Sequence, residues 1–286
     1  MQGKECVLDN DTNTDSISYS RRARYEAVGQ LAAGIIHEIN SPVQYIGDSM
    51  SFIETSFENL SKILIETHKC LRTHISDDEL LEKCNNLLAM NDFEFIQDEY
   101  KNAFKRMYNG LEYIKSIVLA LNRFNFCDLR VKEVVDIYEL VNDMVVITKS
   151  EWKYYADVFI DMMSDDKTIK CYQGDIRQVI LNLIINATHS IKEVYKKTKS
   201  KGTIEVKISQ NNDFLLLSVR DTGEGIDDVI KNKIFDKYFT TNKEEGGTGQ
   251  GLALVYDIVV NKHNGSIWFE SEAGKGTTFH IKLPNM

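Results

Sequence analysis

The feature that most constrains the fold is one apolar stripe that continues through residues 20 to 72. Its members recur at steps of three and four residues, as one face of an amphipathic helix requires: Tyr25, Val28, Ala32, Ile35, Ile39, Val43, Ile46, Met50, Ile53, Phe57, Leu60 and Leu64. At about 1.5 Å per residue the segment predicts a helix of about 75 Å. Such a helix is too long for a compact monomer.

A second apolar stripe runs from Ile96 to Phe124 and predicts a second long helix. A capping box, S-D-D-E at residues 76–79, indicates a short helix before it. Two helices with one apolar face each cannot bury both faces fully against each other, whereas a dimer that forms a four-helix bundle can. We therefore expect a homodimer through residues 20–128, preceded by a flexible tail at 1–19, which has few apolar groups.

After about residue 130 the pattern changes to short strands and helices. Strands are expected in segments 157–163, 168–173, 202–209, 214–221, 265–272 and 276–284, and helices in 175–197 and 251–263. This order predicts an α+β domain over residues 130–286, with helices on one face of a mixed sheet. The fold class is thus α followed by α+β.

Charge and composition exclude several classes of function. The net charge of −9 argues against a nucleic-acid partner. No apolar run approaches the roughly 18 residues of a membrane span, and the acidic start is not a signal peptide. The five cysteines form no C-x-x-C pair and indicate reduced thiols rather than a disulfide framework or a zinc site. We expect a cytoplasmic protein.

His37 lies in the first predicted helix, next to Glu38 and five residues before Pro42. It lies two residues from Ile35 and from Ile39, which places it away from the apolar stripe. The stripe makes its one four-four step at Ile35–Ile39–Val43, where Pro42 removes a backbone hydrogen bond and bends the helix. The sequence therefore predicts an exposed His-Glu pair beside a distortion. Taken alone, a surface histidine on a bent helix is the simpler interpretation.

Two polar stretches of the second domain suggest a nucleotide site. Asn182 and Asn186 lie four residues apart on one helical face, and an amide oxygen is a reasonable ligand for Mg²⁺. Asp221 ends an apolar strand and can accept a hydrogen bond from an exocyclic amine such as that of adenine. Gly223 and Gly225 then permit tight turns. Individually, the pair could be a capping or surface feature and the turn an ordinary one.

A glycine cluster, G-G-T-G-Q-G at residues 246–251, precedes the helix at 251–263. Backbone N–H groups at a helix N-terminus bind phosphate, and glycines let the phosphate approach. The cluster is neither a Walker loop nor a Rossmann fingerprint. Between it and Asp221, the stretch 234–245 joins aromatic residues to a polar run, which suits a mobile lid.

In this order and spacing, the stretches resemble the N, G1, F and G2 boxes of the GHKL (Bergerat-fold) ATP-binding domain. Together with H-E-I-N-S-P on an upstream helical hairpin, residues 25 to 284 are similar to a two-component sensor histidine kinase. The resemblance implies a dimerisation and histidine phosphotransfer domain at 20–128. It also implies a catalytic ATP-binding domain, an α/β sandwich, at 130–286.

The resemblance also implies the role of each site residue. His37 is the phosphoacceptor that attacks the γ-phosphate of ATP, and Glu38 orients the imidazole and takes its proton. Ser41 stands where the family usually has Thr or Asn to position water for receiver dephosphorylation. Asn186 is the Mg²⁺ ligand. The implied nucleotide-binding residues are Asn182, Asn186, His189, Asp221, Gly223, Gly225, Lys243, Gly247, Thr248, Gly249, Gly251 and Leu252.

Three positions depart from the common pattern of the family. His189 replaces a lysine, which makes a phosphate contact there pH-dependent or absent. Lys237 and Asn242 replace the usual proline and lysine of the F box. Lys243 either supplies the missing positive charge or is simply solvated.

The leading prediction is an ATP- and Mg²⁺-dependent protein-histidine kinase that passes phosphate to an aspartate of a separate response-regulator receiver. A nucleotide-binding dimeric scaffold, a GHKL ATPase of the gyrase or Hsp90 type, and an anti-sigma serine kinase are the alternatives. The ATPases typically have Glu at the position of Asn182, and a scaffold does not need His37 and Glu38 intact. An anti-sigma kinase would lack the long dimerising hairpin.

The sequence shows no sensory domain ahead of residue 20. If the chain is the whole protein, we expect a separate sensor in trans to supply the signal, and similar stand-alone kinases suggest an H-NOX haem gas sensor. A chain that is one piece of a larger sensor kinase would explain the same sequence.

Overall fold

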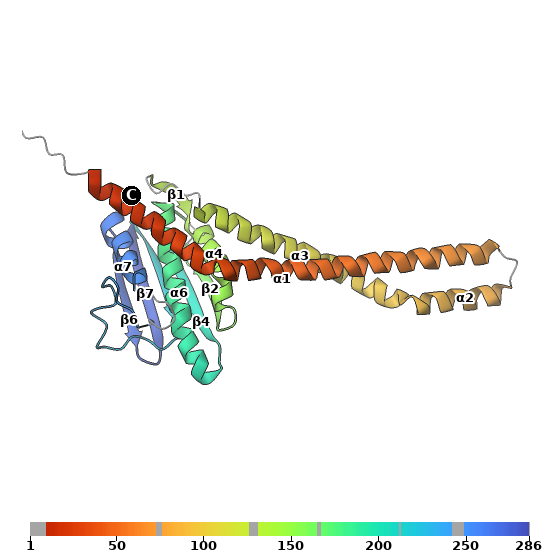
Figure 1. Ribbon diagram of the computed structural model, residues 1–286. Helices are drawn as coiled ribbons and strands as arrows, with labels where there is room; N and C mark the ends of the chain where they lie inside the picture. Colours follow the sequence, from red (N-terminus) through yellow and green to blue (C-terminus); the bar gives the residue numbers. More distant parts are fainter. Residues whose placement is uncertain are drawn as a thin grey trace, which may run out of the picture. The chain divides into compact units, whose positions relative to one another are not determined.

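The computed structural model describes residues 10–72, 76–125, 131–164, 167–211, 213–241 and 249–285. It divides into two compact units: Ile36–Ser116, whose described elements are all helices, and the remainder of the described chain, which contains the sheet (Figure 1).

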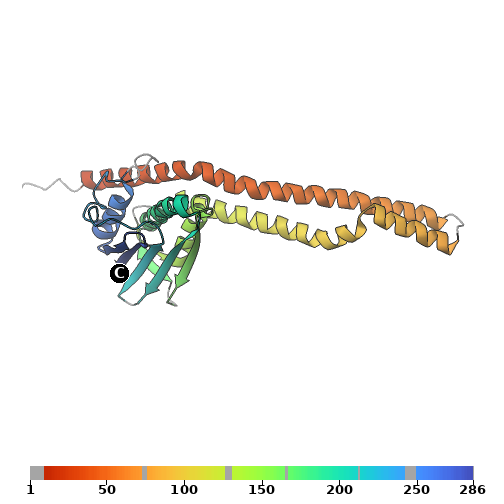
Figure 2. The same cartoon turned by 90° about the horizontal axis from the view of Figure 1, so that it is seen from below.

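The helical unit is built from α1 (Asn10–Arg72), α2 (Asp77–Met90) and α3 (Phe93–Asn125), of which α1 and α3 extend into the other unit. α1 continues for 63 residues through Pro42 and begins at Asn10, earlier than the predicted start near residue 20. The side chain of Ser76 accepts a hydrogen bond from the Glu79 N–H (3.4 Å), which confirms the predicted cap of α2. Figure 2 shows α2 and the first part of α3 returning along α1.

Two parallel rows of residues run along α1 with a seven-residue spacing. Pro42, Ser49, Ser56 and Ile63 are buried, and the two serine hydroxyls donate to backbone carbonyls one turn earlier (2.7 Å each). Immediately beside this row lies an exposed apolar row, here called the heptad ladder: Ile36, Val43, Met50, Phe57, Leu64 and Leu71. Its side chains are 52–72% exposed.

The heptad ladder includes the part of the predicted apolar stripe that one copy of the chain leaves exposed. Val43, Met50, Phe57 and Leu64 were expected in that stripe, and within one chain they are not buried. The periodicity located an apolar face of α1, and the buried side of the helix lies next to that face.

The second unit contains two sheets and the helices that cover the larger one. Its elements are β1 (Glu133–Asp136), α4 (Ile137–Ile147), α5 (Lys149–Trp152), β2 (Ala156–Met162), β3 (Thr168–Cys171), α6 (Gln173–Thr198), β4 (Gly202–Gln210), β5 (Phe214–Asp221), α7 (Gly251–Tyr256), the π-helix η2 (Asp257–Lys262), β6 (Ser266–Glu272) and β7 (Gly276–Pro284). The five-stranded sheet has the order β2-β4-β5-β7-β6. Only β2 and β4 pair in parallel, so the predicted mixed sheet is confirmed.

The core of this unit lies between the five-stranded sheet and α4, α6 and η2 (Figure 2). Every second residue of the central strands is buried, as in the cross-strand row Val206, Val219 and Phe279. α6 faces them with Val179, Ile180, Leu183 and Ile184, all at most 1% exposed. Asp221 takes the last buried position of β5, so the alternation itself turns a carboxylate toward the helices.

A buried ion pair joins three helices of this unit. Arg177 of α6 is 1% exposed and donates from Nη1 to Oδ2 of Asp143 in α4 (2.8 Å). Arg123, in the last turn of α3, donates to Oδ1 of the same carboxylate (3.2 Å). The single buried carboxylate of Asp143 thus accepts hydrogen bonds from two guanidinium groups.

His263 links the end of η2 to the start of α6. Its Nε2 accepts the backbone N–H of Tyr172 (3.2 Å), so Nδ1 carries the proton and donates to the carbonyl of Ile258 (2.8 Å). The ring is therefore held in its neutral form, and burial lowers the pKa of His263 below its ordinary value.

Candidate active site

Asp221 is the buried acid of the site. Its side chain is on the core side of β5, 4% of the residue is exposed, and Oδ1 accepts the backbone N–H of Gly223 (2.8 Å). Burial raises the pKa of Asp221 from 3.8 to about 6, against hydrogen bonds from Gly223, Thr277 and Ser190 that favour the charged form. The site therefore holds a carboxylate acceptor in an environment with little water.

The turn after Asp221 is fixed to α6 and to the β6–β7 hairpin. A Cβ on Gly223 would lie 2.1 Å from Oγ of Ser190, and that oxygen accepts the N–H of Glu224 (3.0 Å). Gly225 has a φ of +75°, and a Cβ there would lie 2.2 Å from the carbonyl oxygen of Glu272. Both glycines are required by space, and one of them also by backbone conformation.

Amide side chains form a row on one face of α6. Gln178 donates from Nε2 to Oδ1 of Asn182 (3.4 Å), and Asn186 follows one turn later. Asn182 in turn donates from Nδ2 to the carbonyl of Gly251 at the start of α7 (3.3 Å). The two asparagines therefore share one face of α6, and Asn182 links this face to the start of the predicted phosphate-binding helix.

The other predicted residues of α6 and α7 are in the same region. His189 lies on α6 beside Ser190, and Leu252 follows Gly251 in the first turn of α7. Oε1 of Gln178 is buried and has no hydrogen-bond partner among the residues that the structure describes. This polar face of α6 has the oxygen atoms that a hydrated hard cation prefers.

A backbone hydrogen bond joins Tyr238 to Gly249, two residues before the start of α7. The N–H of Tyr238 donates to the carbonyl of Gly249 (2.8 Å). Gly249 has a φ of +67°, and a Cβ on it would lie 2.4 Å from the backbone of Tyr238. The predicted site residues Lys243, Gly247 and Thr248 lie outside the described residues.

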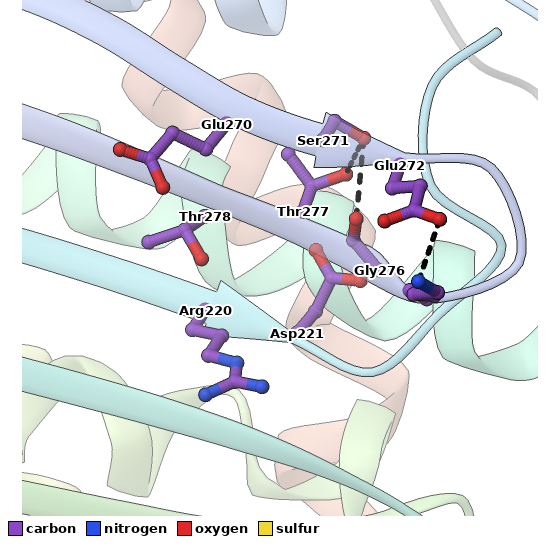
Figure 3. A pocket seen from close by; sticks show the side chains of 9 residues that line it. Arg220, Asp221, Glu270, Ser271, Glu272, Gly276, Thr277 and Thr278 are labelled. Carbon is purple, nitrogen blue, oxygen red and sulfur yellow. Dashed lines mark hydrogen bonds and ion pairs between the residues drawn. The ribbon is translucent and has the colours of Figure 1, made fainter.

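A polar hollow of about 440 Å³ adjoins Asp221. Figure 3 shows it lined by Arg220, Asp221 and residues of the β6–β7 hairpin. Ser271 donates to the carbonyl of Gly276 (3.2 Å) and makes a second hydrogen bond with Thr277 (2.9 Å). A Cβ on Gly276, whose φ is +104°, would lie 2.0 Å from the carbonyl oxygen of Asp221. The hairpin is thus packed directly on the strand end that carries the acid.

The predicted phosphoacceptor segment lies on α1. His37 is exposed, as expected, but Glu38 is 6% exposed, so the prediction of an exposed His-Glu pair is wrong for the acid. The hydroxyl of Tyr113 in α3 donates to Oε2 of Glu38 (2.8 Å). Burial, and then the bond to Glu38, raise the pKa of Tyr113 above its ordinary value. Ser41 is exposed and donates to the carbonyl of His37 (3.0 Å).

Comparison with known proteins identifies the nucleotide-binding part. Residues 171–286 match the family of histidine kinase-, DNA gyrase B-, and HSP90-like ATPases. These residues form a GHKL ATPase domain. The match begins at the end of β3 and includes α6, the turn after Asp221 and α7, which are the elements that meet at the site described above.

Curated relatives that match most of the chain include sensor kinases. The sensor kinase CckA of Brucella abortus is 27% identical over 271 residues, 92% of this chain and 25% of the relative. The sensor histidine kinase ZraS of Escherichia coli is 28% identical over 267 residues, 92% of this chain and 47% of the relative. The solved catalytic domain of histidine kinase ThkA is 27% identical, with 54% of this chain and 97% of that chain covered and a TM-score of 0.46.

The curated relatives and the family match confirm the resemblance to two-component sensor histidine kinases. The element order confirms the predicted fold class, a helical region followed by an α/β domain. The chain spans about a quarter to a half of the length of these curated relatives. Within the described part of the chain, no helix has both the length and the apolar character that crossing a membrane requires.

Three side chains that support the site were not predicted from the sequence. Gln178 and Ser190 continue the four-residue spacing of Asn182 and Asn186, so the row on α6 could have been found from the spacing. Tyr113 gave no such signal, because its contact with Glu38 depends on the register between two helices.

Proposed function

We propose that the chain is an ATP-dependent protein-histidine kinase that phosphorylates itself on His37 and transfers the phosphoryl group to an aspartate of a response-regulator receiver. The observation that carries the proposal is an exposed His37 beside a buried carboxylate, Glu38, in a chain that also contains a GHKL ATPase domain. The sensor kinases among its relatives support the same activity.

Residues of the ATPase domain fit ATP as the substrate. Asp221 offers a buried carboxylate acceptor to the exocyclic amine of adenine. Gly249 lies just before α7, which begins at Gly251 and whose first N–H groups suit phosphate. Asn186 would hold Mg²⁺, with Asn182 on the phosphate side, because both amides lie on the polar face of α6. When bound, Mg²⁺ would neutralise charge on the phosphate oxygens.

The proposed reaction forms one bond and breaks one. A ring nitrogen of neutral His37 attacks the γ-phosphorus of ATP, a nitrogen–phosphorus bond forms, and the bond from this phosphorus to the β–γ bridging oxygen breaks to release ADP. The other ring nitrogen then loses its proton to Glu38. The receiver aspartate takes the phosphoryl group from the phosphohistidine in a second transfer.

Ser41 supports an additional receiver phosphatase activity. It lies one turn after His37 and is exposed. Its hydroxyl proton is used in the bond to the His37 carbonyl, but the oxygen can still accept and so could orient a water molecule.

We also propose a homodimer through residues 20–128. The heptad ladder places an apolar side chain at every seventh residue of α1 from Ile36 to Leu71, and Phe104 and Leu111 of α3 are 54% and 57% exposed. Burial of a large apolar side chain contributes about 1.5–3 kcal/mol, so covering the ladder with a second copy in a four-helix bundle is favourable. A separate sensor in trans, of the H-NOX type, and a cytoplasmic location remain predictions from the sequence.

Autophosphorylation of the full chain with γ-labelled ATP tests the proposal. His37→Ala should abolish acid-labile label while ATP still binds. His68→Ala is the matched control, because His68 is an exposed histidine on the same helix without an acidic neighbour, and it should be labelled normally. Label that persists in His37→Ala would overturn the assignment of the phosphoacceptor.

Transfer separates the kinase from the alternatives. The labelled chain should lose its phosphate to a cognate receiver, and a receiver with Asn in place of its acceptor aspartate should take none. ATP hydrolysis without any labelled protein would instead favour a GHKL ATPase. ATP binding without turnover would favour a nucleotide-binding dimeric scaffold.

A further inference from the structure

We propose that Tyr113 is a positioning residue for the general base, and that its hydroxyl fixes the orientation of the Glu38 carboxylate and keeps it ionised. The inference rests on the proposed kinase function and adds to it a residue outside the predicted site. Tyr113 acts through Glu38 and touches neither ATP nor the reacting nitrogen.

The contact between the two residues is direct and partly buried. The Tyr113 hydroxyl lies 2.8 Å from Oε2 of Glu38, and Glu38 is only 6% exposed although the adjacent His37 is exposed. Both residues belong to the helical unit Ile36–Ser116. A hydrogen bond from a neutral donor to a charged acceptor is stronger than an ordinary one, especially where little water competes.

The helices approach closely at this level because of a glycine. A Cβ on Gly110 of α3 would lie 2.8 Å from the ring of Tyr45 and 2.9 Å from the side chain of Ile46, both on α1. Gly110 is one turn before Tyr113 on the same helical face. The missing side chain therefore allows the approach that brings the Tyr113 hydroxyl within reach of Glu38.

A general base must be ionised and aimed at its proton donor before the reaction begins. Burial alone disfavours the ionised form of a carboxyl group. A hydrogen bond donated to the ionised form opposes that effect. Besides Glu38 and Tyr113 themselves, Tyr45 on α1 is a titratable group that acts on this contact, and His37 precedes Glu38 in the sequence.

The bond to Tyr113 leaves the carboxylate able to accept a proton. An ionised carboxylate has two oxygens and about four acceptor positions, of which Tyr113 occupies one on Oε2. During transfer the proton of His37 moves to Glu38. Tyr113 keeps its own proton, because its pKa is raised above the ordinary value.

The test is the pH profile of autophosphorylation in Tyr113→Phe, which removes only the hydroxyl. We expect the rate at pH 7 to fall about tenfold, and the acidic limb of the profile to move up by about one pH unit. The rate should approach that of the wild type near pH 9, where Glu38 is ionised without help. Tyr108→Phe is the control: Tyr108 lies on the same helix and is 66% exposed, so its profile should not change.

A double-mutant cycle separates positioning from packing. In a Glu38→Gln background, Tyr113→Phe should have no further effect on the rate, because its partner is already neutral. Tyr113→Gln, which restores an N–H donor, should recover part of the activity lost at low pH. An equal loss at every pH, or an equal loss with and without Glu38, would overturn the proposal and assign Tyr113 a packing role.

Failure of the kinase assignment has a different signature. If the wild type carries no label on His37, the proposed function is wrong. If the wild type is labelled and Tyr113→Phe matches it in rate and pH profile, only the positioning role is overturned. Circular dichroism of each variant reports whether the helices have formed.

Discussion

Asp221→Asn should stabilise the ATPase domain at neutral pH while it weakens ATP binding. The acid is buried, and its pKa is raised from 3.8 to about 6. That difference corresponds to a cost of about 3 kcal/mol for the ionised folded state. The asparagine oxygen can still accept the Gly223 N–H, so the turn keeps its hydrogen bond.

The sign of the pH dependence follows from the raised pKa. The folded protein binds the proton of Asp221 more tightly than the unfolded chain does, so this group lowers stability as pH rises toward about 6. The effect is complete above that pH and absent below about 3.8. Between pH 4.5 and pH 7.5, the wild type should therefore lose about 2 kcal/mol of unfolding free energy relative to Asp221→Asn.

Urea unfolding followed by tryptophan fluorescence measures this difference in the full chain without nucleotide. The chain has two tryptophans, and Trp152 and Trp268 both lie in the unit that contains the five-stranded sheet. Asp228→Asn is the control, because the Asp228 side chain is 90% exposed and should change nothing. Parallel stability–pH curves for the wild type and Asp221→Asn would refute the reasoning. ATP affinity should fall by about tenfold or more in the same variant.

Three further predictions follow from other contacts. Asp143→Ala leaves the guanidinium of Arg177 buried without its carboxylate, and urea unfolding should show a loss of about 3–5 kcal/mol; a loss below 1 kcal/mol would contradict this. Met50→Lys, in the exposed heptad ladder, should yield monomers in light scattering at micromolar concentration, whereas the exposed control Glu54→Lys should stay dimeric. The lowered pKa of His263 favours its neutral form, so its contribution to unfolding free energy should be lost as pH falls below about 6.5, and His263→Gln should remove that dependence.

The ATPase domain was predictable from the sequence because its constraints are local. The sequence placed Asp221 at the end of an apolar strand, where the structure buries it, and the neighbouring Gly223 and Gly225 are required by backbone space in the structure. Asn182 and Asn186 share a face because a helix repeats every 3.6 residues. Each inference used residues close together in the chain, where the periodicity of a strand or helix determines which way a side chain points.

The helical unit was harder to predict because burial there depends on the partner helix. Periodicity found an apolar face of α1 that includes Met50 and Phe57, but α3 packs against the adjacent row that includes Ser49 and Ser56. Glu38 was expected to be exposed for the same reason: the side of α1 that is buried lies next to the apolar face that periodicity found. A residue's angle on a helix is local information, whereas the direction from which another helix arrives is not.

The heptad ladder constrains the angular position of every residue around the axis of α1. Seven residues of a straight α-helix fall about 20° short of two full turns, so over five heptads, from Ile36 to Leu71, an apolar seam drifts by roughly 100°. A second helix can follow such a seam only by coiling around the first with a left-handed twist. Insertion of seven residues into α1 would leave the seam continuous, but insertion of four would rotate everything beyond it by about 40°. The angular position of His37 is therefore tied to the number of residues in the helix.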